Sequence, residues 1–490
     1  MKTVIAGGGI GGLVTALYAT HHGDEVTLIE QQSKLGGRMQ YVENAGFKID
    51  AGPTIVLLPD MIQEILQETG FPVESLDWQL CDPLYTMNYP DGSSFRKFNH
   101  PVRQMDEIEA MFPGEGPNYA RFLEEMKVRF EEGRAAFLEK AFLTKRSFFT
   151  AENMKALWRM KAYKSVRSLA RTYFSNPRLQ EAFYFQTLYI GGQPSKAPAM
   201  YSLVPFSEQH HGIWYLKGGY AGLIEAIEAE LRRRGVTIRT NEAVTEVTHE
   251  SNRAVALQTE TGEVEGDRFI MNGDFPVTKE LLKEQSKKPG QTYEPSSGCL
   301  LIYLGLNRFY ADAEVHQFFM NDAFDAHMTD VFKYRSWHPD PSFYVFYPSL
   351  IDETLAPAGK SVMYMLVPVP AGKPDTDVER YAEAVIEKAE ARGFSGLCEA
   401  IEWKELRTPQ DAEMDGLFEG GSFGLAPTLM QSGAFRPQLK PYRSENVYAV
   451  GASIHPGGGV PIVMQGAKLL ARYLYEDTQA PVSSDGKEVE

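Results

Sequence analysis

Thr3-Val4-Ile5-Ala6-Gly7-Gly8-Gly9-Ile10-Gly11-Gly12 is the stretch that decides the fold. The apolar run that ends at Ala6 predicts a short β-strand, and the residues from Ile10 to about His22 predict an α-helix. Glu25 to Glu30 predicts a second strand with an acidic residue at its end. A strand, a G-x-G-x-x-G loop, a helix and a second strand that ends in an acid form the βαβ unit of a dinucleotide-binding site.

Three glycines and one acid of this segment each have a physical task. Gly7 permits the tight turn, Gly9 lets the backbone approach a pyrophosphate, and Gly12 lets the helix pack closely on the strand. The helix N-terminus faces the phosphates, and Glu30 can accept a hydrogen bond from a ribose hydroxyl. A glycine-rich turn without a ligand would not need the strand, the helix and the acid together, so we interpret the segment as a nucleotide site.

A second unit of strand, glycine loop and helix occurs near the other end of the chain. Asn446 to Gly451 predicts a strand, and Ile462 to Tyr475 predicts a helix. The loop between them reads Ala452-Ser453-Ile454-His455-Pro456-Gly457-Gly458-Gly459-Val460-Pro461, with its last proline suited to the first helical position. This pattern predicts a second helix N-terminus that faces an anion, although a simple closure of the sheet would look the same. The loop histidine is expected to be structural, with its ring bonded to backbone.

Composition and charge exclude several classes of protein. The chain has 490 residues, 43% of them hydrophobic and 23% charged, which is typical of a globular protein of two or three domains. Its net charge of −16 argues against nucleic acid as a partner. Cys81, Cys299 and Cys398 lack the spacing of a zinc site or a disulfide framework, which fits a reducing cytoplasmic compartment and predicts no bound metal.

The hydropathy pattern predicts a soluble or peripheral protein. No run reaches the roughly 18 apolar residues of a membrane-spanning helix, and no signal peptide is recognisable. A polar tail after about Thr478 is expected to be disordered.

Two motifs that follow the first loop carry a family resemblance. They are Gly36-Gly37-Arg38, after the second strand, and Asp50-Ala51-Gly52-Pro53-Thr54, after a hairpin-like stretch. With the first loop they resemble the extended FAD fingerprint of amine oxidases, protoporphyrinogen oxidases and carotenoid desaturases. The resemblance implies FAD as the cofactor, with Arg38 near the diphosphate and the turn from Gly52 to Thr54 near the flavin.

The same resemblance gives two later segments a role. The helix N-terminus at Pro461 would face the reduced flavin ring and favour its negative charge. In similar flavoproteins a residue at the position of Val244, within a predicted strand–turn–strand, contacts the adenine by its backbone. The candidate FAD contacts are Gly7, Gly9, Gly12, Glu30, Gly37, Arg38, Gly52, Pro53, Thr54, Val244, Gly451, Ala452, Gly459, Val460, Pro461 and Ile462.

The run Gly218-Gly219-Tyr220-Ala221-Gly222 looks like a third glycine loop. It lacks a predicted strand before it and an acid after it, so we expect a helix-entry turn. The absence of a second complete dinucleotide site argues against an NADPH-fed reductase.

The resemblance is most specific for the bacterial carotenoid desaturases, and it covers nearly the whole chain. The segments that carry it are Phe185 to Gly192, Ala199 to Leu203, Trp214 to Gly219, Leu355 to Gly359, Gly421 to Leu425, Gln431 to Pro437 and Gly451 to Lys468. Phytoene and diapophytoene (dehydrosqualene) desaturases are similar, and the diapophytoene type is nearest. The resemblance implies desaturation of a membrane-dissolved polyene in carotenoid biosynthesis, by hydride transfer to flavin, with quinone or oxygen as the electron acceptor.

Two other functions stay open. Ile454 departs from the small hydroxyl residue that is frequent in the family, and Glu294 to Cys299 is similar to a sister branch that oxidises terminal methyl groups of carotenoids. The first alternative is therefore a carotenoid methyl oxidase, although the segment from Gln431 to Pro437 favours desaturation. The second is a non-catalytic isoprenoid carrier, similar to the dissociation inhibitors of prenylated GTPases, which need not keep both flavin motifs.

These features predict an α/β fold. A Rossmann-type FAD-binding domain, similar to that of amine oxidases and GDP-dissociation inhibitors, is expected beside a discontinuous α+β substrate domain and a helical membrane-docking region. The predicted segments are 1–75, 218–288 and 441–490 for the FAD-binding domain and its tail, 76–217 for the substrate and helical membrane-docking region, and 289–440 for the sheet of the substrate domain. Within the last segment, paired strands are expected around Ser297 to Leu306 and Ser361 to Pro368.

A basic belt interrupts this acidic chain between Lys145 and Arg178. The segment contains nine basic residues and one acidic residue, Glu152, so it carries a net charge of about +8. Interspersed aromatic residues predict one or two interfacial helices that dock on the cytoplasmic face of the membrane, unless the belt is a solvated face packed on acidic neighbours. The residues expected to contact lipid are Lys155, Trp158, Arg159, Lys161, Lys164 and Arg167.

The middle of the chain is also rich in large apolar side chains. These residues could line a tunnel for a polyene or form ordinary core: Phe183, Tyr184, Phe185, Tyr189, Met200, Tyr201, Phe206 and Trp214. No catalytic base is identified, because Glu208, His210 and His211 are expected at the surface. The sequence does not indicate the oligomeric state.

Overall fold

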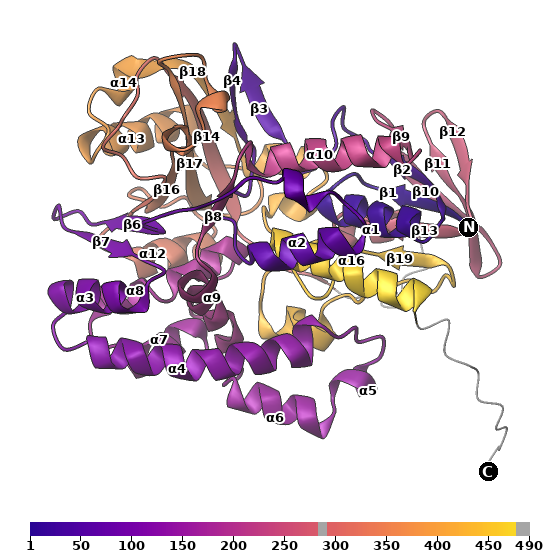
Figure 1. Ribbon diagram of the computed structural model, residues 1–490, viewed down its shortest axis with the longest axis horizontal. Coiled ribbons are helices and arrows are strands. Elements are labelled where there is room, and N and C mark those ends of the chain that lie inside the picture. Colours follow the sequence, from indigo (N-terminus) through magenta and orange to yellow (C-terminus); the bar gives the residue numbers. More distant parts are fainter. Residues whose placement is uncertain (283–291, 477–490) are drawn as a thin grey trace.

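The computed structural model describes residues 1–282 and 292–476 (Figure 1). Within these residues the strands form a five-stranded sheet, a seven-stranded sheet, a three-stranded sheet and two two-stranded ribbons. Helices α3 to α9 form a third region beneath the seven-stranded sheet in the view of Figure 1. The predicted polar tail after Thr478 and the end of the predicted segment 218–288 lie outside the described residues.

The five-stranded sheet is parallel and has the order β19-β13-β1-β2-β9. Its strands come from the start, the middle and the end of the chain: β1 Lys2–Ala6, β2 Glu25–Ile29, β9 Thr237–Arg239, β13 Arg268–Met271 and β19 Val447–Ala449. Helices pack on one face and share an apolar core: α1 Ile10–His21, α2 Pro59–Glu68, α10 Gly219–Arg233 and α16 Val460–Tyr475. Because both faces of a parallel sheet must be covered, the antiparallel strands β10 Val244–Glu250, β11 Arg253–Thr259 and β12 Gly262–Glu265 pack on the other face.

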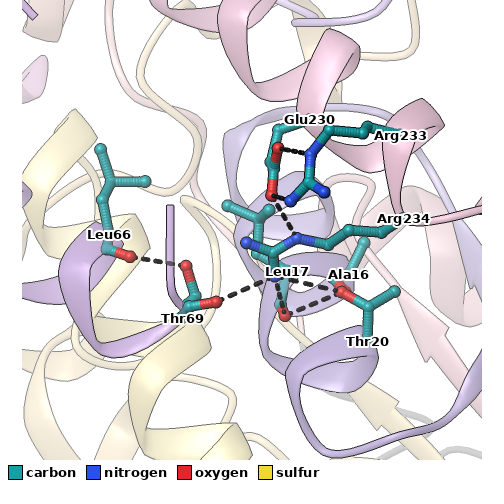
Figure 2. A network of polar contacts seen from close by, with 8 residues as sticks. All are labelled: Ala16, Leu17, Thr20, Leu66, Thr69, Glu230, Arg233 and Arg234. Carbon is teal, nitrogen blue, oxygen red and sulfur yellow. Dashed lines mark hydrogen bonds and ion pairs between the residues drawn. The ribbon is translucent and has the colours of Figure 1, made fainter. Parts of the chain in front are cut away.

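Arg234, just beyond the end of α10, links three of these helices (Figure 2). Its guanidinium pairs with Glu230 at 2.6 Å and donates to the carbonyl oxygens of Leu17 in α1 and Thr69 after α2, at 3.3 and 2.9 Å. Arg233 donates to both oxygens of the same carboxylate. The network therefore holds the ends of α10, α1 and α2 together at the outer side of the nucleotide domain.

The seven-stranded sheet has the order β18-β14-β17-β16-β15-β6-β7. Its strands are β6 Tyr85–Asn88, β7 Ser94–Lys97, β14 Gly298–Leu306, β15 His316–Phe319, β16 Phe343–Phe346, β17 Ser361–Val369 and β18 Ile401–Arg407. β14 pairs with β17 from Gly298↔Val369 to Leu306↔Ser361, so the sheet predicted around these segments is confirmed. Alternate residues face opposite cores: Leu300 and Ile302 pack under α13 Val378–Ala391, whereas Leu301 and Tyr303 face the helical region.

The helical region contains α3 Pro101–Met111, α4 Gly116–Gly133, α5 Lys145–Phe148, α6 Ala151–Arg159, α7 Val166–Tyr173, α8 Pro177–Glu181 and α9 Leu203–His211. In the described part of the basic belt there are thus four short helices, and the prediction of one or two is wrong. The breaks are set by side chains: Thr150, Ser165 and Asn176 each accept a backbone N–H of the helix that follows. Each such cap starts a new helix in a different direction.

The remaining elements connect these layers. They are β3 Tyr41–Asn44 with β4 Phe47–Asp50, β5 Trp78–Leu80 with β8 Trp214–Leu216, α11 Phe275–Leu281, α12 Phe324–Thr329, α14 Leu397–Ala400 and α15 Pro409–Met414. The glycine run at Gly218 enters α10, as predicted. A strand does precede it, contrary to the prediction, but β8 pairs with β5 and not with the parallel sheet. None of the helices in the described ranges combines the length and the apolar character that crossing a bilayer requires.

Candidate active site

A cavity of about 1370 Å³ runs from the parallel sheet to the helical region. This volume exceeds the roughly 300–1,000 Å³ that is usual for a site with one small ligand. Every candidate FAD-contact residue except Gly12 lines it, so residues from both ends of the chain meet at one site. Gly12 lies behind the loop, where a Cβ atom would come within 2.2 Å of the Gly7 carbonyl oxygen. That contact matches the close packing of helix on strand for which the sequence predicted a glycine.

The first glycine loop is held by Asn272, a residue that the sequence did not single out. Its side-chain amide donates to the carbonyl oxygens of Gly7 and Gly9, at 3.0 and 3.2 Å. Gly7 has φ +105°, which favours glycine, and a Cβ at Gly9 would lie 3.1 Å from the amide nitrogen. Asn272 directly follows β13, and only the pairing of β13 with β1 brings it to the loop. No local sequence signal could have found it.

The predicted ribose acceptor, Glu30, is buried at the end of β2 and lines the cavity. Its carboxylate accepts the backbone N–H groups of Gly8 at 2.7 Å and Gln32 at 2.8 Å. A second acid, Glu242, also lines this part of the cavity and is paired with Arg239. Val244 at the start of β10 lies beside it, so the nucleotide end of the cavity is rich in hydrogen-bond acceptors.

The turn from Gly52 to Thr54 is fixed by tyrosines of the seven-stranded sheet. Tyr303 donates to the Ala51 carbonyl at 2.6 Å, and Tyr364 donates to the Gly52 carbonyl at 3.1 Å. A Cβ at Gly52 would lie 2.5 Å from the Arg38 carbonyl oxygen, so the turn and the Gly36-Gly37-Arg38 motif are in close contact. The seven-stranded sheet and the Gly36-Gly37-Arg38 motif therefore meet at this turn.

Tyr344 forms a buried polar cluster beside the same turn. Its hydroxyl lies 2.9 Å from Thr54 Oγ1 and 2.6 Å from His316 Nδ1. Burial lowers the pKa of His316 to about 3, so the ring is neutral, and its Nε2 has no partner in the described structure. Thr54 and Tyr344 line the cavity, which gives this apolar wall one polar position next to the predicted flavin contact.

The C-terminal loop leads into the N-terminus of α16. Gly459 has φ +98° and precedes Val460 and Pro461 in the first turn of the helix. His455 is buried, and its Nε2 lies 3.0 Å from the Lys140 carbonyl oxygen. Burial lowers its pKa to about 4. The prediction that this histidine bonds backbone is confirmed.

The far half of the cavity is lined mainly by apolar and aromatic side chains. Among the residues that could form a tunnel or core, Phe185, Tyr189, Met200 and Tyr201 line the cavity. Phe183, Tyr184 and Phe206 lie in the main apolar core, and Trp214 packs at the edge of the nucleotide domain. Part of the set therefore lines the cavity and the rest is core, and a polyene tunnel stays a prediction. The sheet adds Leu301, Phe318, Met320 and Leu366 to the lining.

The expected surface position of Glu208 is wrong. Its side chain is fully buried, with Tyr85 of β6 donating at 3.0 Å and Gln186 at 3.1 Å. Burial raises the pKa of Glu208 and lowers that of the nearby buried Lys97. His210 is exposed as expected, whereas His211 is only half-exposed. Glu208 does not line the cavity, so it has no direct access to a ligand there.

The basic belt is partly neutralised by acidic neighbours. Arg159 pairs with Glu132 at 3.1 Å, and Arg167 pairs with Asp325 at 3.0 Å. Lys155 and Trp158 are exposed, the latter with 70% of its surface accessible, and Lys161 and Lys164 are half-exposed. Several large apolar side chains in this part of the chain and near Leu429 are exposed: Leu143, Phe149, Trp158, Leu429 and Met430. Of these, Phe149 and Leu429 also line the cavity, and we call these two residues the rim.

Comparisons with known proteins agree with this geometry. The model of the flavin containing amine oxidoreductase family matches residues 10–474. A putrescine oxidase structure superimposes with a TM-score of 0.66 at 12% identity, covering 98% of this chain and all of that one. The structure of a Rab GDI from Plasmodium falciparum superimposes with a TM-score of 0.56 at 11% identity, covering 97% and 98%. At these identities the structures show the fold, which is the predicted amine oxidase and GDI type.

Curated relatives match over almost the full chain. The 4,4'-diapolycopen-4-al dehydrogenase of Metabacillus indicus is 49% identical over 98% of both chains. The zeta-carotene-forming phytoene desaturase of Myxococcus xanthus is 32% identical over 96% of this chain and 93% of its own. A 4,4'-diapophytoene desaturase of Staphylococcus haemolyticus is 31% identical over 98% and 99%. The chain therefore belongs to the flavin containing amine oxidoreductase family, as an FAD-dependent oxidoreductase of its carotenoid desaturase and dehydrogenase branch.

Proposed function

We propose that this protein desaturates an apolar polyene of the diapophytoene or phytoene type, in carotenoid biosynthesis. One observation carries the proposal: a single cavity has glycine loops at one end and aromatic and aliphatic side chains at the other. Its volume has room for a dinucleotide and a second long ligand. The desaturase relatives, at 31–32% identity over nearly the whole chain, support the same substrate class.

We propose that FAD lies along the fifteen candidate residues that line the cavity, with Gly12 packed behind the first loop. The residues fit the group, because backbone of the first glycine loop, of the turn at Gly52 and of the loop before α16 lines one cavity. Glycine at positions 12 and 52 lets these loops pack without collisions with the Gly7 and Arg38 carbonyl oxygens. When bound, FAD accepts a hydride from an allylic C–H bond of the polyene, and a proton leaves the neighbouring carbon. The residues of the chain align the polyene, exclude water with the walls of the cavity, and hold the turn from Gly52 to Thr54 against the sheet.

A second candidate function is oxidation of a terminal aldehyde of the polyene to an acid. The relative at 49% identity is named for such a substrate, and it exceeds the desaturases in identity by a wide margin. The hydroxyl of Tyr344, between Thr54 and His316, could bind the oxygen of the reacting end. In this reaction water would add to the aldehyde carbon and supply the oxygen atom. The hydride of that carbon would pass to bound FAD, and a proton would leave to solvent.

We further propose that the rim and the basic belt dock on the cytoplasmic face of the membrane. The exposed side chains of Phe149, Trp158 and Leu429 would enter the interface, and the lysines of the belt would meet anionic headgroups. A polyene could then pass from the bilayer into the cavity without crossing water. A membrane quinone or oxygen would reoxidise the flavin.

The test is product analysis with the purified holoprotein in liposomes. Diapophytoene, phytoene, diaponeurosporene and diapolycopenal are supplied separately with quinone or oxygen, and the products are identified by mass. Loss of two hydrogen atoms per step supports desaturation, and gain of one oxygen atom by the aldehyde supports the second candidate. A colourless protein that returns every polyene unchanged would instead indicate an isoprenoid carrier.

A further inference from the structure

Arg436 is a buried cation without an acidic partner. Its side chain is 3% exposed, and no carboxylate of residues 1–282 or 292–476 lies within the 4.0 Å of an ion pair. The guanidinium instead donates to three backbone carbonyl oxygens: Nε to Ile454 at 3.3 Å, Nη1 to Gln431 at 3.2 Å, and Nη2 to Ala452. Carbonyl dipoles satisfy its hydrogen bonds, but they leave its full charge in place.

This arrangement is physically unusual. Buried charges in proteins are normally paired, because transfer of an unpaired ion from water to the interior costs several kcal/mol. Two other arginines follow the rule, since the buried Arg268 pairs with Asp24 and the half-buried Arg234 pairs with Glu230. Asp274, which also lines the cavity, acts on this charge through space but forms no ion pair with it. A cation without an ion-pair partner next to a ligand cavity favours a ligand that brings negative charge.

The position of Arg436 identifies the ligand. Two of its three carbonyl acceptors, Ala452 and Ile454, belong to the glycine loop that leads into α16. A Cβ atom at Gly457 would lie 3.9 Å from the guanidinium carbon, so the charge lies directly behind this loop. Arg436 and Gly457 both line the cavity. The glycine loop is the segment proposed above to contact the flavin ring.

We propose that Arg436 stabilises the negative charge of reduced FAD and thereby raises the reduction potential of the cofactor in this protein. Hydride transfer adds two electrons and one proton to the ring, so the product carries one negative charge unless a second proton follows. The N-terminus of α16 offers about half a positive charge to this anion. The guanidinium adds a full charge in an environment from which water is excluded. The inference rests on the proposed position of the flavin, and it does not depend on which polyene is the substrate.

The test compares two variants that differ in charge. Arg436→Lys and Arg436→Gln both lose the three-carbonyl fork, but only the lysine keeps the cation. The readouts are the midpoint potential of bound FAD and the dissociation constant of sulfite, which adds to oxidised flavin and leaves its negative charge on the ring. We expect Arg436→Gln to weaken sulfite binding roughly tenfold or more, with a lower potential, since a tenfold change for a two-electron couple corresponds to about 30 mV. Arg436→Lys should stay near the native values.

Arg234→Gln is the control, because it removes a half-buried, paired arginine that packs beside the parallel sheet and does not line the cavity. It should reduce stability and leave the potential unchanged. The proposal is overturned when Arg436→Gln retains FAD with native potential and sulfite affinity, or when both Arg436 variants shift equally.

If the Arg436 variants no longer bind FAD, the comparison is made instead on the native holoprotein. The absorbance of its reduced FAD is followed against pH. Protonation at the same pH as free reduced FAD would contradict the proposal, whereas protonation only at lower pH supports it. The potential, the sulfite affinity and the pH titration are all measured without substrate turnover. Failure of the proposed polyene reaction would therefore not be mistaken for failure of this inference.

Discussion

The two ends of the cavity are built on different principles. At the nucleotide end, backbone geometry determines which residues fit. Gly7, Gly12 and Gly52 occupy positions where a Cβ atom would meet a backbone oxygen or where φ is positive. At the polyene end, side-chain volume and apolar character are what matter. Phe185, Met200 and similar residues could therefore be exchanged for others of similar size. A backbone requirement leaves a motif of fixed spacing, whereas a volume requirement leaves only a composition. The nucleotide end should therefore be intolerant of single methyl groups, and the polyene end tolerant.

The largest effect is expected for Gly12→Ala. The new Cβ would lie 2.2 Å from the Gly7 carbonyl oxygen, so α1 or the loop must move. We expect FAD affinity to fall at least a hundredfold, about 2.7 kcal/mol, as measured by flavin fluorescence during dialysis. Gly222→Ala in α10 is the control, because its Cβ would meet only ordinary contacts at 3.4 Å and beyond. Native FAD affinity in Gly12→Ala would show that the loop tolerates a shift.

The next largest effect is expected on membrane binding by the basic belt. Lys155→Glu with Lys164→Glu reverses two belt charges that have no ion pair in the described structure. Each basic residue near an anionic surface contributes about 1 kcal/mol, so removal of both should weaken liposome binding roughly thirtyfold or more. Lys388→Glu with Lys404→Glu, near the α13 side of the molecule (Figure 1), is the control. Co-sedimentation at moderate salt measures the effect, and equal binding by both double variants would rule out docking through the belt.

Tyr344→Phe examines a polar position in the apolar wall. It removes the hydroxyl between Thr54 and His316 and keeps the ring volume. For an aldehyde polyene we expect kcat/KM to fall about tenfold, since a positioned hydrogen bond contributes roughly 1.4 kcal/mol, and for a hydrocarbon polyene we expect little change. Tyr364→Phe, which bonds only the Gly52 carbonyl, should affect both substrates equally. Equal losses in Tyr344→Phe would argue against a role in binding oxygen.

The difference between a motif of fixed spacing and a contact made only in the folded chain also explains what could be predicted from the sequence. The βαβ unit, the second glycine loop and the β14–β17 pair were recognisable because their signals are local in spacing and periodicity. Asn272 was not, because its contact with Gly7 exists only after β13 pairs with β1. Glu208 was misplaced at the surface for a similar reason: its partners Tyr85 and Gln186 come from distant segments. The domain boundaries and the FAD contacts themselves stay predictions.

The smallest effect on the cavity is expected for Arg234→Ala. This variant tests whether the Arg234 network contributes to stability only and not to FAD binding. The variant loses charge-assisted hydrogen bonds to Glu230 and to the Thr69 carbonyl (Figure 2), so the free energy of unfolding should fall by about 1–3 kcal/mol. FAD affinity should not change.

The loss should also depend on pH. Hydrogen bonds from Arg233 and Arg234 lower the pKa of Glu230 to about 2 in the folded protein, below its ordinary value of 4.5. A carboxylate with a lowered pKa stabilises the fold above its unfolded pKa, and this contribution disappears as pH falls through the folded pKa. The difference between native protein and Arg234→Ala should therefore be largest near pH 6 and shrink between pH 5 and pH 2. Urea unfolding of the holoprotein across this range measures it. A difference that is constant with pH would mean that the carbonyl contacts of Arg234, and not its pairing with Glu230, hold the three helices together.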